Sequence, residues 1–327
     1  MTAPVSDDVL HDVVVVGGGA AGLAAATWLG RYRRDTVVVD SGDYRAARVE
    51  TSHGYLARDP QQPMELLTTA RAQLTAYKTV QVRPGRVTSV RKTGDCFEVT
   101  LDDGATLRSC RVILATGVVD ACPDLDNFDE HYGASAFHCP SCDGYDAADR
   151  DVIAYGWDER LVGFAASLLD WATSVTVLTG GHRFAGDEVC LDVLGRHGIE
   201  LIDTEATRLV GSRGALEGVE LADGRLVPGS LLFFSVAHQP RTELAEQLGC
   251  RIDEDGYVDV DGDGRTSIPG VYAAGDLAPG MQLVQVAAAK GTIAGINAAL
   301  SLHGEPGSPR SPEPAPDAAV ELDQARP

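Results

Sequence analysis

The chain has 327 residues and a net charge of −21, with 27 basic residues against 48 acidic ones. This length accommodates about two domains, and a hydrophobic fraction of 44% is ordinary for a globular protein with a sizeable core. Because so acidic a surface repels phosphate backbones and anionic lipids, the composition argues against nucleic acid and membranes as partners.

The N-terminal segments predict a strand, a glycine turn, a helix and a second strand. Val13–Val16 is an apolar β-branched run, Ala20–Leu29 favours a helix, and Thr36–Val39 is a second β-branched run that ends at Asp40. Residues 13–30 carry no charge, which raises the alternative of a membrane span or signal peptide. Glycines interrupt this stretch, however, and acidic rather than basic residues precede it. We therefore predict a cytoplasmic protein.

The turn at residues 17–22 carries the pattern G-x-G-x-x-G, directly after a strand and before a helix. In this pattern Gly17 permits the tight turn, Gly19 lets the backbone approach a pyrophosphate, and Gly22 lets helix and strand pack closely. The phosphates would lie at the helix N-terminus, where free N–H groups favour an anion. Asp40 lies 18 residues after Gly22, in position to accept hydrogen bonds from ribose hydroxyls. The segment predicts dinucleotide binding, with a purely structural turn as the alternative.

The remaining segments continue the alternation of strands and helices. A helix is predicted over Pro63–Tyr77, then short strands separated by turns, and a buried strand over Val112–Ala115. A second strand–helix–strand unit is predicted at Asp151–Tyr155, Leu161–Ala172 and Val175–Leu178. The later predicted elements are strands at Glu200–Asp203, Leu216–Leu221 and Leu231–Ser235, a strand entering a turn at about Gly270–Asp276, and a long helix from about Leu283 to Leu300.

This order predicts an α/β protein of two Rossmann-like, three-layer ββα dinucleotide-binding domains, the second inserted into the first. Residues 1–119 and 242–303 would form the FAD-type domain, and residues 120–241 the inserted domain. Residues 304–327 are rich in Pro, Ser, Glu, Asp and Ala, which predicts a disordered tail.

Two of the seven cysteines are closely spaced, Cys139 and Cys142, within the sequence F-H-C-P-S-C-D-G. An odd number of cysteines with a single close pair is not the disulfide framework of a secreted protein. A C-x-x-C pair can close a small ring reversibly, and its N-terminal thiolate often has a depressed pKa. A zinc site, which would need two further ligands, and an inert buried pair are the alternatives to a redox pair.

Over about residues 11–302 the chain resembles the low-molecular-weight thioredoxin reductases, which are FAD homodimers. The N-terminal glycine pattern, the A-T-G segment ending at Gly117, the C-x-x-C-D-G segment and the V-Y-A-A-G-D segment ending at Asp276 carry this resemblance. It implies FAD rather than NAD, with Asp276 bound to the ribityl chain and the helix N-terminus near Gln282 directed at the flavin pyrimidine edge. The implied cofactor-binding residues are Gly17, Gly19, Ala20, Ala21, Gly22, Asp40, Ser41, Thr116, Gly117, Gly275, Asp276, Gln282 and Leu283.

The same resemblance assigns roles around the cysteine pair. Cys142 would be the flavin-proximal thiol that makes the charge-transfer contact, Cys139 the thiol that exchanges with substrate, and Asp143 the acid that follows the second cysteine. His138, beside the outer cysteine, is instead similar to the arrangement in the dithiol oxidases that close the disulfides of gliotoxin and holomycin. An imidazole there would deprotonate an incoming thiol near neutral pH. A surface histidine beside a loop is the alternative.

The inserted domain departs from the reductase pattern at both NADPH motifs. Its glycine motif is G-W-D-E-R-L, residues 156–161, so that Asp158 places a negative charge where a pyrophosphate would need bare backbone. The arginine pair expected for the 2′-phosphate is replaced by Gly180 and Gly181, and His182 and Arg183 come too late for that register. We therefore expect the domain to keep its fold without binding a nicotinamide.

These observations predict a cytoplasmic FAD homodimer that oxidises a small dithiol to a disulfide with O2 as acceptor and without NADPH. Three alternatives remain: an NADPH-dependent reductase of a thioredoxin-like protein, a reductase fed by ferredoxin or another flavin, and a flavin-binding redox-sensing regulator. Ferredoxins are usually acidic, so the net charge counts mildly against that partner.

Overall fold

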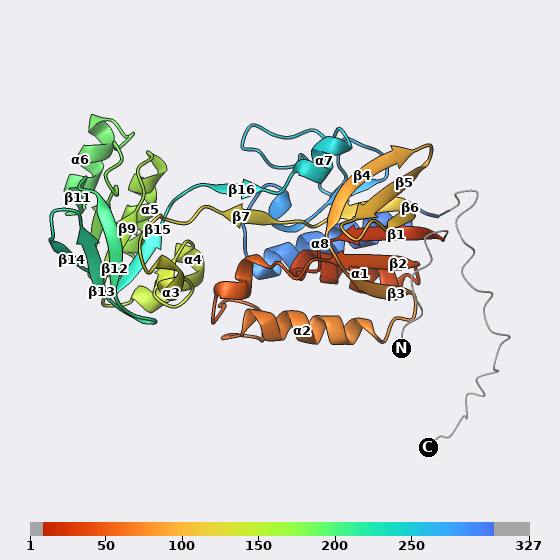
Figure 1. The fold of residues 1–327 in the computed structure, drawn as a ribbon, viewed down its shortest axis with the longest axis horizontal. Helices are drawn as coiled ribbons and strands as arrows, with labels where there is room; N and C mark the ends of the chain where they lie inside the picture. The colour runs from red at the N-terminus through yellow and green to blue at the C-terminus, as the bar shows by residue number, and fades with distance from the viewer. Residues whose placement is uncertain (1–8, 304–327) are drawn as a thin grey trace, which may run out of the picture.

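The computed structural model describes residues 9–303. The tail predicted at 304–327 lies outside the described residues. Figure 1 shows two lobes side by side, joined by a pair of extended segments.

The first lobe is built on a seven-stranded sheet in the order β3-β2-β1-β6-β5-β4, with β17 also paired to β6. Strands β3, β2, β1, β6 and β17 run parallel, whereas β4 and β5 form an antiparallel extension. The strands are β1 (Leu10–Val16), β2 (Thr36–Asp40), β3 (Val80–Pro84), β4 (Val87–Thr93), β5 (Cys96–Leu101), β6 (Thr106–Leu114) and β17 (Val271–Ala273). The helices are α1 (Ala20–Arg31), α2 (Pro63–Leu74), α7 (Glu243–Gln247) and α8 (Val284–Leu300), with short 3-10 helices η1 (Arg45–Arg48) and η3 (Gly275–Leu277).

Strand β1 is the centre of this lobe. It is paired in parallel with β2 on one side and β6 on the other, and Val13–Val15 have no exposed surface. Both faces of the sheet are therefore covered, which explains why β1 is a continuous apolar run rather than an alternating one. The uncharged stretch at 13–30 is thus a strand and a helix, and within residues 9–303 no helix is long and apolar enough to cross a membrane.

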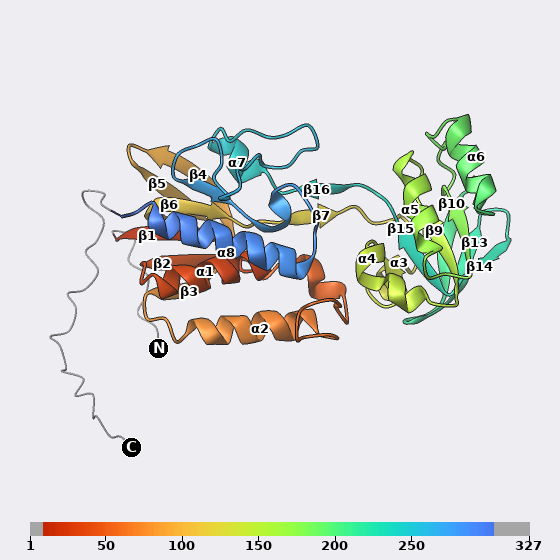
Figure 2. The same ribbon diagram turned by 180° about the vertical axis from the view of Figure 1, so that it is seen from behind.

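Helices α1 and α8 pack against each other beside the sheet, and Figure 2 shows α8 running along α1. Their approach is close because α8 presents glycines to α1. A Cβ atom on Gly291 would lie 2.0 Å from the carbonyl oxygen of Ala21, and one on Gly295 would lie 2.7 Å from that of Ala25. Since α1 and α8 both begin at the edge of the large cavity described below, their packing positions its walls.

The second lobe contains a parallel five-stranded sheet in the order β11-β10-β9-β15-β8 and an antiparallel three-stranded sheet, β12-β13-β14. Its strands are β8 (Ala136–Phe137), β9 (Asp151–Tyr155), β10 (Ser174–Leu178), β11 (Glu200–Ile202), β12 (Ala206–Ser212), β13 (Ala215–Leu221), β14 (Leu226–Pro228) and β15 (Leu231–Phe234). Its helices are α3 (Phe128–His131), α4 (Pro140–Asp143), α5 (Arg160–Leu168), α6 (Glu188–Arg196) and the 3-10 helix η2 (Gly144–Ala147).

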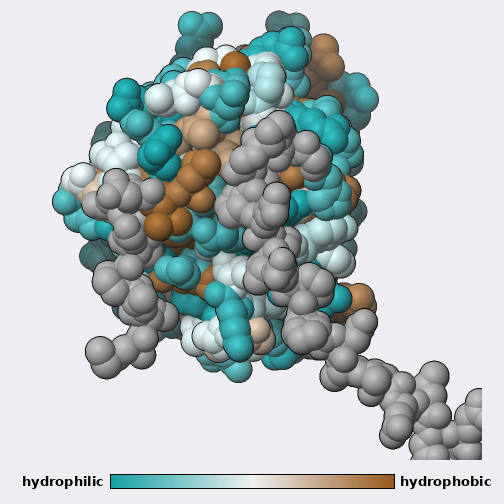
Figure 3. All heavy atoms as spheres, turned by 90° about the vertical axis from the view of Figure 1, so that its right-hand side faces the viewer, coloured by the Kyte–Doolittle hydropathy of each residue, from teal (hydrophilic) through white to brown (hydrophobic). Residues whose placement is uncertain are grey.

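The chain crosses between the lobes twice, through β7 (Val118–Asp120) and β16 (His238–Pro240). These two strands pair with each other in antiparallel fashion. The face of the first lobe that points away from the second is mostly hydrophilic, with scattered hydrophobic patches (Figure 3).

The predicted fold class, two Rossmann-like α/β units, is confirmed, and the differences concern element ends. The helix predicted over Leu161–Ala172 ends at Leu168, because the chain then forms i→i−3 turns, from the Leu169 N–H to the Ala166 oxygen and onward to Trp171. The strand predicted over Val112–Ala115 begins earlier, at Thr106, because its first half pairs with β5.

Candidate functional site

The glycine turn between β1 and α1 has the geometry that its sequence predicts. Gly17 has φ +109°, and a Cβ atom there would lie 2.3 Å from the carbonyl oxygen of Ala115. A Cβ atom on Gly22 would lie 1.8 Å from the oxygen of Gly17, so no larger residue fits at either position. Gly19, in contrast, has nothing within 4 Å of its Cβ direction. The turn therefore leaves open space where a pyrophosphate would approach the backbone.

Two carboxylates mark the ends of the same cavity. Asp40, at the end of β2, is 8% exposed and accepts hydrogen bonds from the Tyr44 hydroxyl at 2.5 Å and from Arg71 Nη2 at 2.6 Å. Asp276, in η3, accepts from Arg45 Nη1 through Oδ2 at 3.0 Å. Its Oδ1 is buried and has no hydrogen-bond partner among residues 9–303. A buried, unpaired carboxylate oxygen at this place fits the hydroxyl of a ribityl chain.

A cavity of about 920 Å³ joins these features. It is lined by twelve of the thirteen predicted cofactor-binding residues, from Gly17 at the phosphate end to Leu283 at the N-terminus of α8. The exception, Gly22, lies beneath the turn and acts through packing. The cavity is large enough for a dinucleotide, and the second lobe also contributes His138, Cys139, Ser141, Cys142 and Asp143 to its wall.

Cys139 and Cys142 are joined in a disulfide at the start of α4. Cys139 is the N-cap residue, and its Sγ accepts a hydrogen bond from the backbone N–H of Cys142 at 3.1 Å. Such a donor would stabilise a thiolate at Cys139 when the disulfide is opened. The pair is thus in its oxidised form, with the two sulfurs bonded to each other.

The disulfide lies between the large cavity and a smaller one of about 330 Å³. Cys142 lines the large cavity and not the small one, whereas Cys139 lines both. The walls of the small cavity combine apolar side chains with charged and polar ones, Asp120 among them. They include Pro140, Phe164, Phe234, Val236, Met281 and Leu283, together with Arg45, His138 and His238.

Asp143 directly follows Cys142 and is only 6% exposed. Burial is the main reason that the pKa of this carboxyl is raised to about 7; the nearby charge of Asp146 adds to the shift and His53 partly offsets it. Asp143 therefore titrates near physiological pH, as a group that donates and accepts protons must.

His138 connects β8 to the cysteine pair and is half-buried. Its Nδ1 lies 3.3 Å from the Tyr132 hydroxyl. Burial lowers the pKa of His138 to about 4, with Asp120 acting in the opposite direction. The imidazole is consequently neutral at pH 7, and its one unprotonated ring nitrogen is a weaker base than that of the exposed histidine assumed from the sequence.

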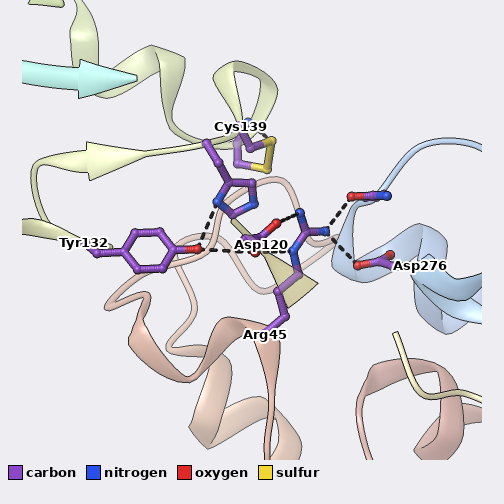
Figure 4. The surroundings of a disulfide bond; sticks show 8 residues. Arg45, Asp120, Tyr132, Cys139 and Asp276 are labelled. Atoms are coloured by element: carbon purple, nitrogen blue, oxygen red, sulfur yellow. Dashed lines mark hydrogen bonds and ion pairs between the residues drawn. A yellow bond between two sulfur atoms is a disulfide. The ribbon is translucent and has the colours of Figure 1, made fainter. Parts of the chain in front are cut away.

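An arginine-centred cluster at the same place was not predicted from the sequence (Figure 4). Arg45 in η1 makes a bidentate ion pair with Asp120, through Nε–Oδ2 at 2.8 Å and Nη2–Oδ1 at 2.6 Å. Its Nη1 donates to Asp276 Oδ2 and, at 2.6 Å, to Gln282 Oε1. The one sequence signal was position, since Asp120 stands at the predicted boundary between the two domains.

The second lobe has aromatic and charged side chains at the crevice where the fold would place a nicotinamide dinucleotide. This crevice would lie at the carboxyl ends of β9 and β10, which are neighbours in the parallel sheet of the second lobe (Figure 1). There the Trp157 indole stacks on the His182 imidazole with ring centroids 3.8 Å apart, and the Ala185 N–H donates to the Trp157 oxygen at 2.8 Å. Asp158 pairs with Arg160 at 2.8 Å, so this arginine is already engaged.

The comparison with protein families decides the relationship. The family model for pyridine nucleotide-disulphide oxidoreductases matches residues 11–291. The chain belongs to this family. The thioredoxin reductase from Claviceps purpurea named tcpT is 30% identical over 305 residues, covering 89% of this chain and 94% of the relative. The one from Leptosphaeria maculans named sirT is 30% identical over 309 residues, covering 88% and 92%.

Two solved structures are similar to this pyridine nucleotide-disulphide oxidoreductase in fold as well as in sequence. The crystal structure of HlmI is 35% identical, with a TM-score of 0.84 over 89% of this chain and 93% of that one. The structure of an oxidoreductase from Agrobacterium tumefaciens is 31% identical, with a TM-score of 0.82 over 90% and 98%. The expectations of a thioredoxin reductase-like enzyme, an oxidoreductase and an FAD protein are thereby confirmed.

Proposed function

We propose that this oxidoreductase is a dithiol oxidase that closes a disulfide in a small substrate, with O2 as the electron acceptor and without NADPH. The observation that carries the proposal is the position of the Cys139–Cys142 disulfide between two cavities. One cavity has the shape and polar groups for FAD, and the other has room for a small, largely apolar molecule.

The reaction begins in the small cavity. A substrate thiol gives its proton to His138 and attacks the Sγ of Cys139, which breaks the disulfide and releases Cys142 as a thiolate. The second substrate thiol then loses its proton to solvent and attacks the substrate sulfur bound to Cys139, whose own sulfur leaves as a thiolate and takes the proton held by His138. This step releases the product disulfide and leaves both cysteines reduced.

The two electrons leave through the other cavity. FAD held there by the glycine turn at 17–22 and by Asp276 would supply a two-electron acceptor on the Cys142 side that O2 can reoxidise, so that one dithiol and one O2 would give one disulfide and one H2O2. Asp143, buried beside Cys142 with a pKa of about 7, takes up and returns the accompanying proton. The N–H of Cys142 steadies the charge on Cys139 while the pair is reduced.

The second lobe supports the proposal that NADPH takes no part. A pyrophosphate at the β9–α5 turn would face the carboxylate of Asp158, and like charges about 4 Å apart cost on the order of 4 kcal/mol at an effective dielectric of about 20. It would also have to separate the Trp157–His182 stack. Neither of these two aromatic residues lines either cavity of the cysteine pair.

The remaining expectations belong to the same proposal. We propose a cytoplasmic homodimer that acts on a small dithiol rather than on nucleic acid or a membrane. A thioredoxin-like protein is the second candidate substrate, favoured by the thioredoxin reductase names of tcpT and sirT.

The test is steady-state turnover of the FAD-loaded protein in air. We expect a small dithiol to drive O2 uptake with one H2O2 per disulfide formed, without any effect of added NADPH. A monothiol of the same thiol pKa should react far more slowly, because its second attack is bimolecular. NADPH-dependent reduction of a thioredoxin would contradict the proposal, electron exchange with a one-electron carrier alone would favour the ferredoxin-type reductase, and a lack of any turnover would favour the regulator.

A further inference from the structure

His138 lies at one end of a chain of three side chains that come from three separate segments. Its Nδ1 lies 3.3 Å from the Tyr132 hydroxyl, and that hydroxyl lies 3.4 Å from Asp120 Oδ2. Arg45 holds both oxygens of Asp120, through one hydrogen bond to Oδ2 and one to Oδ1. Figure 4 shows Tyr132, Asp120 and Arg45 directed toward one another beside Cys139.

The positions of the protons in this series of His138, Tyr132 and Asp120 follow from the charges of Arg45 and Asp120. Burial alone would raise the pKa of Asp120, but the hydrogen bonds and charge of Arg45 outweigh it and hold the pKa below its usual range. Asp120 is therefore an ionised carboxylate and a stronger acceptor than a neutral imidazole. The Tyr132 hydroxyl has a single proton, and it goes to Asp120. The Tyr132 oxygen is then left to accept from the Nδ1–H of His138.

We propose that Tyr132 and Asp120 are positioning residues that fix the tautomer of His138, so that Nε2 carries the lone pair that receives the substrate's proton. The proposal rests on the proposed function insofar as His138 is the base of that reaction. Arg45 completes the arrangement as the counter-ion that keeps Asp120 ionised.

Aromatic packing around Tyr132 keeps this series of side chains in place. Tyr132 is only 4% exposed and its ring packs against those of Phe128 and Phe234, with centroids 5.5 and 5.6 Å away. Burial raises the pKa of the Tyr132 phenol, so it remains a protonated donor at every physiological pH. The charged and titratable groups that act on His138 are Asp120 on β7, Arg45 on η1 and His238 on β16.

The tautomer matters for the first step of the reaction. When the substrate thiol transfers its proton to Nε2, the imidazole becomes a cation whose Nδ1–H still points at Tyr132 and, through it, at Asp120. The thiolate attacks Cys139 and the electron pair of the broken S–S bond stays on Cys142. With the opposite tautomer, the cavity would meet an N–H donor that takes up no proton.

The test uses Tyr132→Phe, with Tyr145→Phe as the matched control because Tyr145 is 81% exposed in the same lobe. The measured quantity is the rate of anaerobic flavin bleaching by dithiols of different thiol pKa. We expect Tyr132→Phe, like His138→Ala, to lose about 10²-fold with a dithiol of ordinary thiol pKa at pH 7. The loss should shrink for more acidic dithiols and above pH 9, where the thiol ionises without a base. Tyr145→Phe should match the wild type.

A purely structural role for Tyr132 would lower the rate by the same factor for every dithiol and at every pH, and would overturn the proposal. So would a wild-type rate in Tyr132→Phe. A second measurement does not depend on turnover: in ¹⁵N-histidine spectra, His138 should carry its proton on Nδ1 in the wild type, and Asp120→Asn should shift it toward Nε2. A proton on Nε2 in the wild type would refute the inference even if the variants failed to fold.

Different results would refute the proposed oxidase activity and the tautomer assignment of His138. Anaerobic bleaching does not need O2, so a protein that bleaches with dithiols but takes up no O2 refutes the oxidase and not the tautomer assignment. A full-rate His138→Ala variant removes His138 as the base, and the inference falls with it while the oxidase stands.

Discussion

Cys139 and Cys142 are three positions apart but have different surroundings. Cys142 lines only the large cavity, whereas Cys139 lines both cavities. The motif predicted the redox pair, because a C-x-x-C segment needs only local spacing. It did not predict Arg45, Asp120 and Tyr132, because these residues are brought together by the fold from distant segments and each, read alone, is an ordinary charged or aromatic residue.

The division of labour between the two cysteines is tested with Cys142→Ser and Cys139→Ser. We expect Cys142→Ser to retain FAD but to resist bleaching by dithiothreitol, and to form a stable mixed disulfide at Cys139 with an added monothiol disulfide. In Cys139→Ser, a thiol reagent should label Cys142 more slowly than it labels Cys139 in Cys142→Ser. The exposed Cys122 is the internal reference in peptide mapping. Bleaching of Cys142→Ser at the wild-type rate, or faster labelling of Cys142, would reverse the assignment.

The raised pKa of Asp143 predicts a pH-dependent contribution to stability. Between its unfolded value of 3.8 and its folded value of about 7, the folded protein holds a proton that the unfolded chain has lost. The free energy of unfolding therefore falls as pH rises through this window, by up to about 1.4 kcal/mol per pH unit. Asp143→Asn removes the effect, so its Tm relative to the wild type should rise from pH 5 to pH 7 and then level off. A constant difference across pH 5 to 8 would place the pKa outside this window.

At the scale of elements, the segments with strong local patterns were the ones predicted best. β1 and α1 follow from an apolar β-branched run, a glycine turn and a helix-forming run, and α8 begins one residue from its predicted start. The end of α5 was wrong because the turns after Leu168 depend on i→i−3 bonds that the apolar pattern does not reveal. The Trp157–His182 stack could not be predicted from local sequence patterns either, because it forms only when the loop after β10 folds back on Trp157.

The packing of α8 on α1 is tested with Gly291→Ala. The new Cβ would lie 2.0 Å from the backbone of Ala21, so the helices must separate. We expect a loss of about 1–3 kcal/mol or more in stability, with weaker FAD retention because both helices border the cavity.

Gly163→Ala is the matched control, because this glycine is exposed in α5 and its Cβ would meet nothing within 4 Å. That change should leave FAD bound and raise the stability by up to about 1 kcal/mol. Equal effects of the two substitutions on Tm and on absorbance at the flavin band after desalting would contradict the role assigned to Gly291.

For the whole molecule, the orientation of the two lobes is what directs the disulfide at the flavin cavity. Segment 45–50 of the first lobe pairs with the second through Arg45–Asp120, Arg48–Asp129 and Glu50–Arg213. The last two pairs are exposed and contribute little individually, whereas the Arg45 pair is mostly buried.

The most direct measurement is anaerobic mixing of the FAD-loaded protein with NADPH or with a small dithiol, followed by admission of air. We expect NADPH to leave the flavin absorbance unchanged for minutes, because Asp158 and the Trp157–His182 stack oppose its binding. The dithiol should bleach the flavin, and air should restore it with release of H2O2. Bleaching by NADPH within seconds would contradict the oxidase and identify the protein as an NADPH-dependent thioredoxin reductase.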